Sequence, residues 1–209
     1  MSIKKWKPDE IETESFRLIT EILGDNQPPE ETAAIIKRVI HTTADFEYRE
    51  SMYFSPGVVG AIAAALKAGA HIVTDTNMAK SGINAAALKR LSAQLHCFIA
   101  DEDVRDAARA GGTTRAVASM EKAARIGAPV IFALGNAPTA LIRICEMYEA
   151  GEISPAAVIG VPVGFVNVVE AKEMVIESGI PCIVARGRKG GSNVAAAIVN
   201  AILYELGGR

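Results

Sequence analysis

The sequence has few aromatic residues, only three histidines, and no excess of charge of either sign. Its 209 residues include 22 Lys and Arg against 24 Asp and Glu, which gives a net charge of −2. Proteins that bind a nucleic-acid backbone or an anionic membrane surface through electrostatics carry a clear positive bias. We therefore expect neither nucleic acid nor a membrane as a partner.

Cysteine is also scarce, and its spacing excludes a disulfide framework. Cys97, Cys145 and Cys182 are an odd number, lie far apart, and each sits in an apolar run. They form no CxxC pair of the kind that binds a metal. Free cysteines are usually buried small hydrophobic residues. We expect three buried thiols, no metal and no redox cofactor.

Long apolar stretches are missing as well. Runs such as "VVGAIAAALKAGAHIV" are interrupted by Lys or Gly, well short of the roughly 20 residues that cross a membrane. The first residues, "MSIKKWKPDEIE", turn acidic without an apolar segment after the basic ones. This pattern argues against a secretory signal and predicts a cytoplasmic location.

The chain does contain a regular alternation of short apolar runs and helical segments. Residues 9–23 and 29–41 have apolar positions at helical spacing, and a further helix is expected over 56–68. Five apolar runs of strand length follow, at 71–75, 95–100, 129–134, 156–162 and 181–186. Such continuous runs are typical of parallel strands buried on both faces. With right-handed crossovers, they predict a single domain over residues 1–209, a three-layer α/β/α sandwich around a mostly parallel five-stranded sheet.

Ligands of such sheets bind at the carboxyl ends of the strands. Four loops follow strands there, each containing Gly or Asn or both: "TDTNMAKSGI", "ALGNAPTAL", "GVPVGFVNV" and "ARGRKGGSN". Each precedes a helix whose first-turn N–H groups are expected to point into the site, which favours a ligand rich in carboxylates or phosphates. Neither a Walker A loop nor GxGxxG is present. A nucleotide is therefore weakly supported.

Two basic side chains stand at helix ends. Arg115 opens a helix in "GGTTRAVAS", where a cation opposes the helix dipole. It is either a solvated surface arginine or a residue that binds an anion. His41 closes a helix one turn after Arg38, and is either a structural histidine or a proton donor. His71 and His96 fall at or within strands, where a structural role is expected.

Several longer motifs resemble one family in the same order. "LGNAPTAL", "GVPVGFVNVVEAKE" and "RGRKGGSNVAAA" are similar to the precorrin-8X methylmutases of corrin biosynthesis, and "RVIH", "FSPG", "AALKAGAHIVTD" and "TTRA" fit them too. The resemblance extends from about Ser15 to about Ala197.

This resemblance implies an isomerase that moves a methyl group from C-11 to C-12 of precorrin-8 or cobalt-precorrin-8. His41 would protonate a ring nitrogen and assist a suprafacial 1,5 shift. Ser15, Arg38 and Arg115 would contact the substrate, and Asn84 would supply a further polar contact. The family implies a homodimer with the tetrapyrrole near the subunit interface, and the reaction requires no cofactor.

Two other classes of function stay open on the residues. The same loops would suit a non-catalytic tetrapyrrole carrier that holds an unstable product. They would also suit a nucleotide- or acyl-CoA-binding enzyme of flavodoxin-like architecture, although the phosphate motifs are missing. The sequence leaves open whether the macrocycle already contains cobalt, with the short chain favouring the cobalt form.

Overall fold

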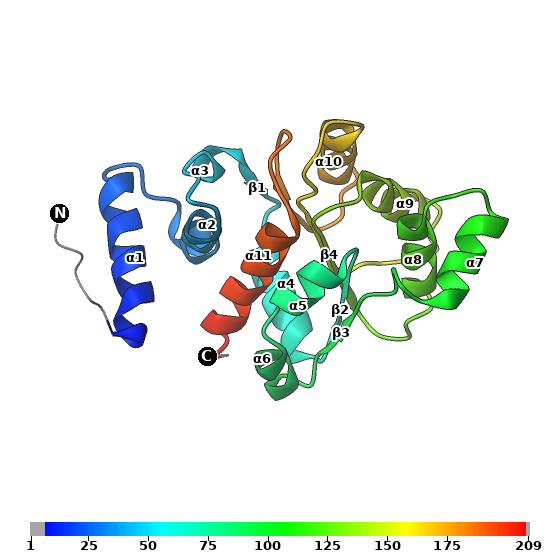
Figure 1. Cartoon of the computed structure of the whole chain (residues 1–209), viewed down its shortest axis with the longest axis horizontal. Coiled ribbons are helices and arrows are strands. Elements are labelled where there is room, and N and C mark those ends of the chain that lie inside the picture. Colours follow the sequence, from blue (N-terminus) through cyan, green and yellow to red (C-terminus); the bar gives the residue numbers. More distant parts are fainter. Residues whose placement is uncertain (1–6, 208–209) are drawn as a thin grey trace.

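The computed structural model describes residues 7–207, in which one six-stranded sheet runs through the centre (Figure 1). The strand order is β1-β6-β5-β4-β2-β3, and every pair is parallel except β1 with β6. The strands are β1 (Met52–Phe54), β2 (His71–Thr74), β3 (Gln94–His96), β4 (Val130–Leu134), β5 (Ala157–Gly160) and β6 (Cys182–Ala185). The predicted α/β class and mostly parallel sheet are confirmed.

The predicted strand number of five is wrong, because β1 is a sixth strand. It has only three residues, too few to show a period-two pattern, and it runs antiparallel to β6 with Met52 opposite Ala185. Ser55 extends this pairing, since its N–H donates to the Cys182 carbonyl and its hydroxyl accepts from the Cys182 N–H. Strand pairing at this edge comes from tertiary contact rather than from a local sequence signal.

Helices cover both faces of the sheet, as the three-layer prediction requires. Strand residues alternate between two cores: Ile131 and Ala133 of β4 face one, and Val130 and Phe132 face the other. The first face carries α2 (Glu30–Thr43), α4 (Val58–Lys67), α5 (Asn77–Gly82), α6 (Ala85–Arg90) and α11 (Ser192–Glu205). The second carries α8 (Arg115–Ala123), α9 (Pro138–Glu149) and α10 (Val168–Glu177).

Three helices lie outside these layers or at their margins. In Figure 1, α1 (Pro8–Leu23) lies at one end of the molecule beside α2, and α7 (Glu102–Ala110) lies at the other end beside α8. The short α3 (Tyr48–Ser51) leads into β1. Within residues 7–207, no helix is both long enough and apolar enough to cross a membrane.

The segment from Asn77 to Arg90 is two short helices rather than one continuous helix. It is interrupted at Asn84, whose side-chain oxygen accepts the N–H of Ala87 at 3.0 Å and so caps the start of α6. Asparagine is among the residues most favoured at this position, because its side chain satisfies a backbone donor that the new helix leaves free. The three cysteines are free and buried, as predicted.

Candidate active site

His41 lies in the last turn of α2, where the chain leaves the helix. Ala44 ends α2 in the left-handed conformation, with φ of 55°, and leaves the His41 side chain exposed. The imidazole stacks on Phe16 of α1, with ring centroids 5.3 Å apart and 27° between planes. The ring is thus oriented by an aromatic neighbour and open to a ligand.

Arg38 lies one turn before His41 and is the point where three helices meet. Its guanidinium lies 4.6 Å from the Phe16 ring centre and 5.0 Å from that of Tyr204 on α11. It also forms an ion pair with Glu12 of α1. Stacking on two aromatic faces fixes the plane of a guanidinium. Arg38 therefore presents its donors in a defined direction.

Two cavities flank Arg38 between α2 and α11. One of about 320 Å³ is lined by Phe16, Arg38 and Tyr204 among others. The second, of about 260 Å³, is lined by Arg38, Tyr204 and residues near the start of α11, including Asn193. Each alone lies at or below the small end of ligand pockets. The groove accommodates part of a large ligand and leaves the rest exposed.

Ser15 and Asn84 border the same region. Ser15 precedes Phe16 on α1, is half-buried, and donates its hydroxyl to the Ile11 carbonyl at 2.9 Å. The main-chain N–H of Asn84 donates to the Asn200 side chain at 2.8 Å, and Asn200 lines the smaller cavity. The structure therefore brings the surroundings of Ser15, Arg38, His41 and Asn84 to one side of the molecule.

Arg115 lies away from the α2 groove. It is the first residue of α8, as the sequence predicted, and its side chain is exposed, with no ion pair to another residue in the range 7–207. Figure 1 shows α8 and α2 on opposite sides of the molecule. Arg115 thus remains available to an anion, but within one chain it does not join His41 and Arg38.

The loop between β4 and α9 is bound to a buried carboxylate. The amides of Gly135, Asn136 and Ala137 donate to the Asp75 carboxylate at 3.0, 2.8 and 2.7 Å. Asp75 follows β2 and is 1% exposed. Burial raises the pKa of its carboxyl group, while the three hydrogen bonds oppose that rise. These loop amides bind a side chain of the protein itself and are not free for a ligand.

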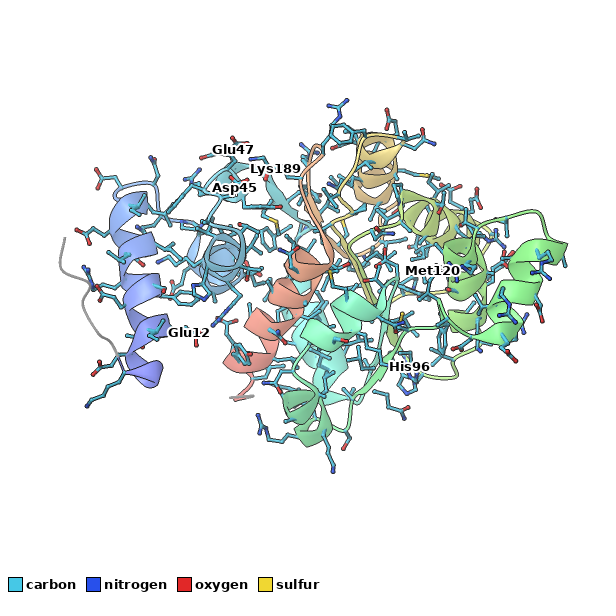
Figure 2. The ribbon with its side chains drawn as sticks, in the orientation of Figure 1. Glu12, Asp45, Glu47, His96, Met120 and Lys189 are labelled. Atoms are coloured by element: carbon cyan, nitrogen blue, oxygen red, sulfur yellow. The ribbon has the colours of Figure 1, made fainter. Side chains whose placement is uncertain are left out.

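The loop between β6 and α11, residues 186–191, is tied to the segment that follows His41. The Lys189 ammonium lies 2.5 Å from the Asp45 carboxylate and 2.8 Å from that of Glu47, and the three side chains converge in Figure 2. These contacts raise the pKa of Lys189 and lower that of Asp45. We call residues 186–191 the glycine-rich loop.

The other two histidines contact each other. The rings of His71 on β2 and His96 on β3 are 3.1 Å apart at Nδ1 and Nε2. Burial, with His71 and Lys80 nearby, lowers the pKa of His96. β3 is the sheet edge opposite β1. This pair therefore lies on different elements from the α2 groove.

Sequence reasoning missed the residues that orient the candidates. Phe16, Tyr204 and Glu12 surround Arg38, yet each reads locally as an ordinary helix residue. A signal was present on α11, where Asn193, Asn200 and Tyr204 recur at spacings of seven and four in an otherwise apolar helix. Polar side chains on one stripe of a buried helix indicate a face toward a cavity.

The comparisons with known proteins agree with one another. A family model described as precorrin-8X methylmutase matches residues 10–205. The cobalt-precorrin-8 methylmutase of Salmonella typhimurium is 44% identical over 206 residues, covering 96% of each chain. That of Priestia megaterium is 42% identical over 196 residues, covering 94% of this chain and 87% of the relative.

A solved structure gives the same assignment. The precorrin-8x methyl mutase of Thermus thermophilus superposes with a TM-score of 0.86 at 39% identity, covering 94% of this chain and 95% of that one. At such identity and coverage, sequence and fold agree over nearly the whole chain. The chain belongs to the precorrin-8X methylmutase family, isomerases that move a methyl group within one molecule.

Proposed function

We propose that the protein converts cobalt-precorrin-8 by moving a methyl group from C-11 to C-12 of the macrocycle, giving the cobyrinate product. The supporting observation is the family match over residues 10–205 together with an exposed histidine at an aromatic and basic groove. The cobalt form is preferred to metal-free precorrin-8 because relatives at 40–44% identity carry the cobalt-precorrin-8 name.

His41 acts as general acid in this proposal. Its ring is held against Phe16, at the C-terminal end of α2. A proton donated to the conjugated macrocycle polarises it and lowers the barrier to the 1,5 shift; after the shift the proton returns to His41, so the reaction is a net isomerisation. The remaining catalysis is positioning, since the bonds broken and formed lie within one molecule.

Arg38 binds a carboxylate arm of the substrate. It already holds the Glu12 carboxylate, so substrate binding exchanges one carboxylate for another at a guanidinium whose plane is fixed. Ser15 and Asn84 add polar contacts around the same groove. Arg115 binds a further carboxylate, which its exposed position at the start of α8 allows.

We further propose that the protein works as a homodimer. Ile11, Leu18 and Ile22 leave an apolar stripe exposed along α1, and exposed apolar patches of this kind favour protein contacts. Neither cavity beside Arg38 is large enough for a whole macrocycle, so a second copy over this side would enclose more of it. Isologous dimers are the commonest soluble oligomers. Light scattering of the purified protein gives the mass directly.

We also propose that residues 1–209 act as one domain in the cytoplasm. Two cores on the opposite faces of one sheet support the first statement, and three free cysteines fit a reducing compartment. Differential scanning calorimetry with a single transition and cell fractionation test the two statements.

Turnover of the two candidate substrates, offered side by side to the purified protein, tests the proposal. We expect conversion of cobalt-precorrin-8 with a larger kcat/KM than for precorrin-8. Tight binding of the product without conversion of either substrate would instead identify a carrier. Stabilisation against heating by nucleotides or coenzyme A, without any response to a corrinoid, would identify the flavodoxin-like alternative.

A further inference from the structure

Lys172, on α10, is an unusual residue for the interior of this protein. Its side chain is 0% exposed, and no carboxylate in the range 7–207 forms an ion pair with it. The adjacent Glu173 pairs with Arg186 instead, at 3.2 Å. Lysine is almost never fully buried unless it is paired. The position therefore needs an explanation other than packing.

The ammonium of Lys172 binds the backbone of the glycine-rich loop. Its Nζ donates to the carbonyl oxygens of Gly187 and Lys189, both at 2.8 Å. Hydrogen bonds from a charged donor are about twice as strong as those between neutral groups. The two bonds span three consecutive residues of the loop and fix its path above α10.

The same loop is pressed against the segment after β5. A Cβ on Gly190 would lie 2.1 Å from the Val161 carbonyl oxygen, so only glycine allows this approach. The Gly191 N–H donates to that carbonyl at 2.8 Å, and the Gly164 N–H donates to the Arg188 carbonyl at 3.2 Å. The glycine-rich loop is thus held both by the Lys172 side chain and by backbone hydrogen bonds to the segment between β5 and α10.

The outer side of the loop reaches the end of α2. The side chain of Lys189, whose own carbonyl is bound by Lys172, forms the ion pairs with Asp45 and Glu47. Asp45 is four residues after His41. A continuous path of contacts therefore runs from Lys172 through Lys189 to the segment that follows His41.

Stability does not account for Lys172. Burial lowers the pKa of its ammonium from 10.5 to about 8, with Glu173 opposing this slightly. Taking an ammonium out of water costs several kcal/mol, so a buried charge is weak evidence for a role in stability. The charged side chain that acts on it is Glu173 on α10, which itself pairs with Arg186 of the glycine-rich loop.

We infer that Lys172 is a positioning residue for the reaction: it holds the glycine-rich loop so that the Lys189 ion pairs set the end of α2 and the orientation of His41. This inference rests on the proposed function. It requires that the loss of Lys172 affects the chemical step more than substrate binding, because the carboxylate contacts of Arg38 and Arg115 lie on other elements.

The first test compares Lys172→Met with Lys172→Arg and a control, Lys67→Met, at an exposed position on α4. For Lys172→Met we expect kcat to fall about tenfold or more, since small misplacements of catalytic groups have effects of this size, with KM unchanged. Lys172→Arg, which keeps the charge and the donors, recovers part of the loss. Lys67→Met behaves as the wild type.

A double-mutant cycle distinguishes positioning from a general structural role. If Lys172 acts through Lys189, the Lys172→Met/Lys189→Met protein is no slower than Lys172→Met alone, because residues in one network are not additive. Two independent structural effects would multiply instead. Hydrogen exchange at the Gly164 and Gly191 amides rises in Lys172→Met and reports the freed loop directly.

The possible failures are separable. An inactive wild type contradicts the proposed function itself. An active wild type with an equally active Lys172→Met, or with multiplying losses in the cycle, overturns the role of Lys172 alone. An unfolded Lys172→Met also overturns it, because the ammonium would then be needed for the fold and not only for the loop.

Discussion

Two loops at the same edge of the sheet are each held by a buried charged side chain, and the charges are opposite. Asp75 accepts three amides of the β4–α9 loop, whereas Lys172 donates to two carbonyls of the glycine-rich loop. The first arrangement uses the donors that an anionic ligand would need. The second uses carbonyls only and leaves the loop's basic side chains on the outer side.

The contrast between these two buried charges bears on which of the two loops has a role in the reaction. Three amide donors stabilise the ionised Asp75 against the effect of burial, so this contact belongs to the fold. Lys172 makes only two hydrogen bonds, both to backbone carbonyls, and burial lowers the pKa of its ammonium to about 8. A group that contributes little to stability, yet fixes a loop beside the α2 groove, is more readily explained by function.

Of the changes considered, removal of the Asp75 carboxylate is expected to have the largest effect, a loss of folding stability. Asp75→Ala leaves three donors without an acceptor, and each buried unsatisfied donor costs about 1–3 kcal/mol. We expect a loss of about 3–5 kcal/mol in the free energy of unfolding, measured by urea denaturation. Asp25→Ala, at an exposed position, is the control. Equal stability of the two variants would remove Asp75 from its structural role.

Substitution of Arg115 is expected to have an intermediate effect, on the affinity for the corrinoid. The start of α8 is joined to α9 by the Thr114 and Thr139 hydroxyls, 3.2 Å apart, next to the loop whose amides Asp75 occupies. We proposed that Arg115 binds a carboxylate there. Arg115→Lys keeps the charge but loses bidentate contact, so we expect roughly tenfold weaker binding of cobyrinate.

Titration of cobyrinate, followed by its visible spectrum, measures that affinity. Arg125→Lys, an exposed arginine just beyond α8, serves as the matched control. Identical affinities for the two variants would exclude Arg115 from the substrate site.

The pH dependence of stability gives the smallest effect. Because the folded-state pKa of Lys172 is about 8 and the reference value is 10.5, the unfolded chain binds more protons above pH 8, and stability rises with pH. The gain is about 1 kcal/mol by pH 9. The thiols of buried Cys145 and Cys182, with pKa about 11, make the folded protein less stable as the pH rises further. The contribution of Lys172 is therefore read from the difference in stability between the wild type and Lys172→Met at each pH.

Melts at pH 7, 8 and 9 in both proteins measure this difference. We expect the wild type to gain on the variant as the pH rises. Parallel curves would mean that the Lys172 ammonium is not buried in the folded protein.

The sequence was informative where the physics is local. Continuous apolar runs located β2 to β6, and the apolar periodicity located α1, α2 and α4, because burial on two faces or one leaves a direct pattern. It failed at β1, whose three residues pair only because β6 is present, and at Asn84, where one capping side chain divides a helix.

The candidate site was predictable only in part, for a related reason. His41 and Arg38 share a helix face, so their proximity follows from helical spacing. Phe16 and Tyr204 approach Arg38 from separate helices, and Asp75 reaches amides 60 residues or more away in sequence. Contacts between distant elements leave no local signal.

The central claim is that His41 supplies the proton for methyl migration, and the rate of His41→Ala tests it most directly. We expect the variant to fold, to bind cobyrinate, and to turn over at least about a hundredfold more slowly. His41→Asn, which retains a hydrogen-bonding group without a titrating proton, should bind equally and remain as slow. The wild-type rate should fall as the pH rises through the range in which histidines lose their proton. A near-normal rate in His41→Ala, together with a flat pH profile in the wild type, would contradict the account.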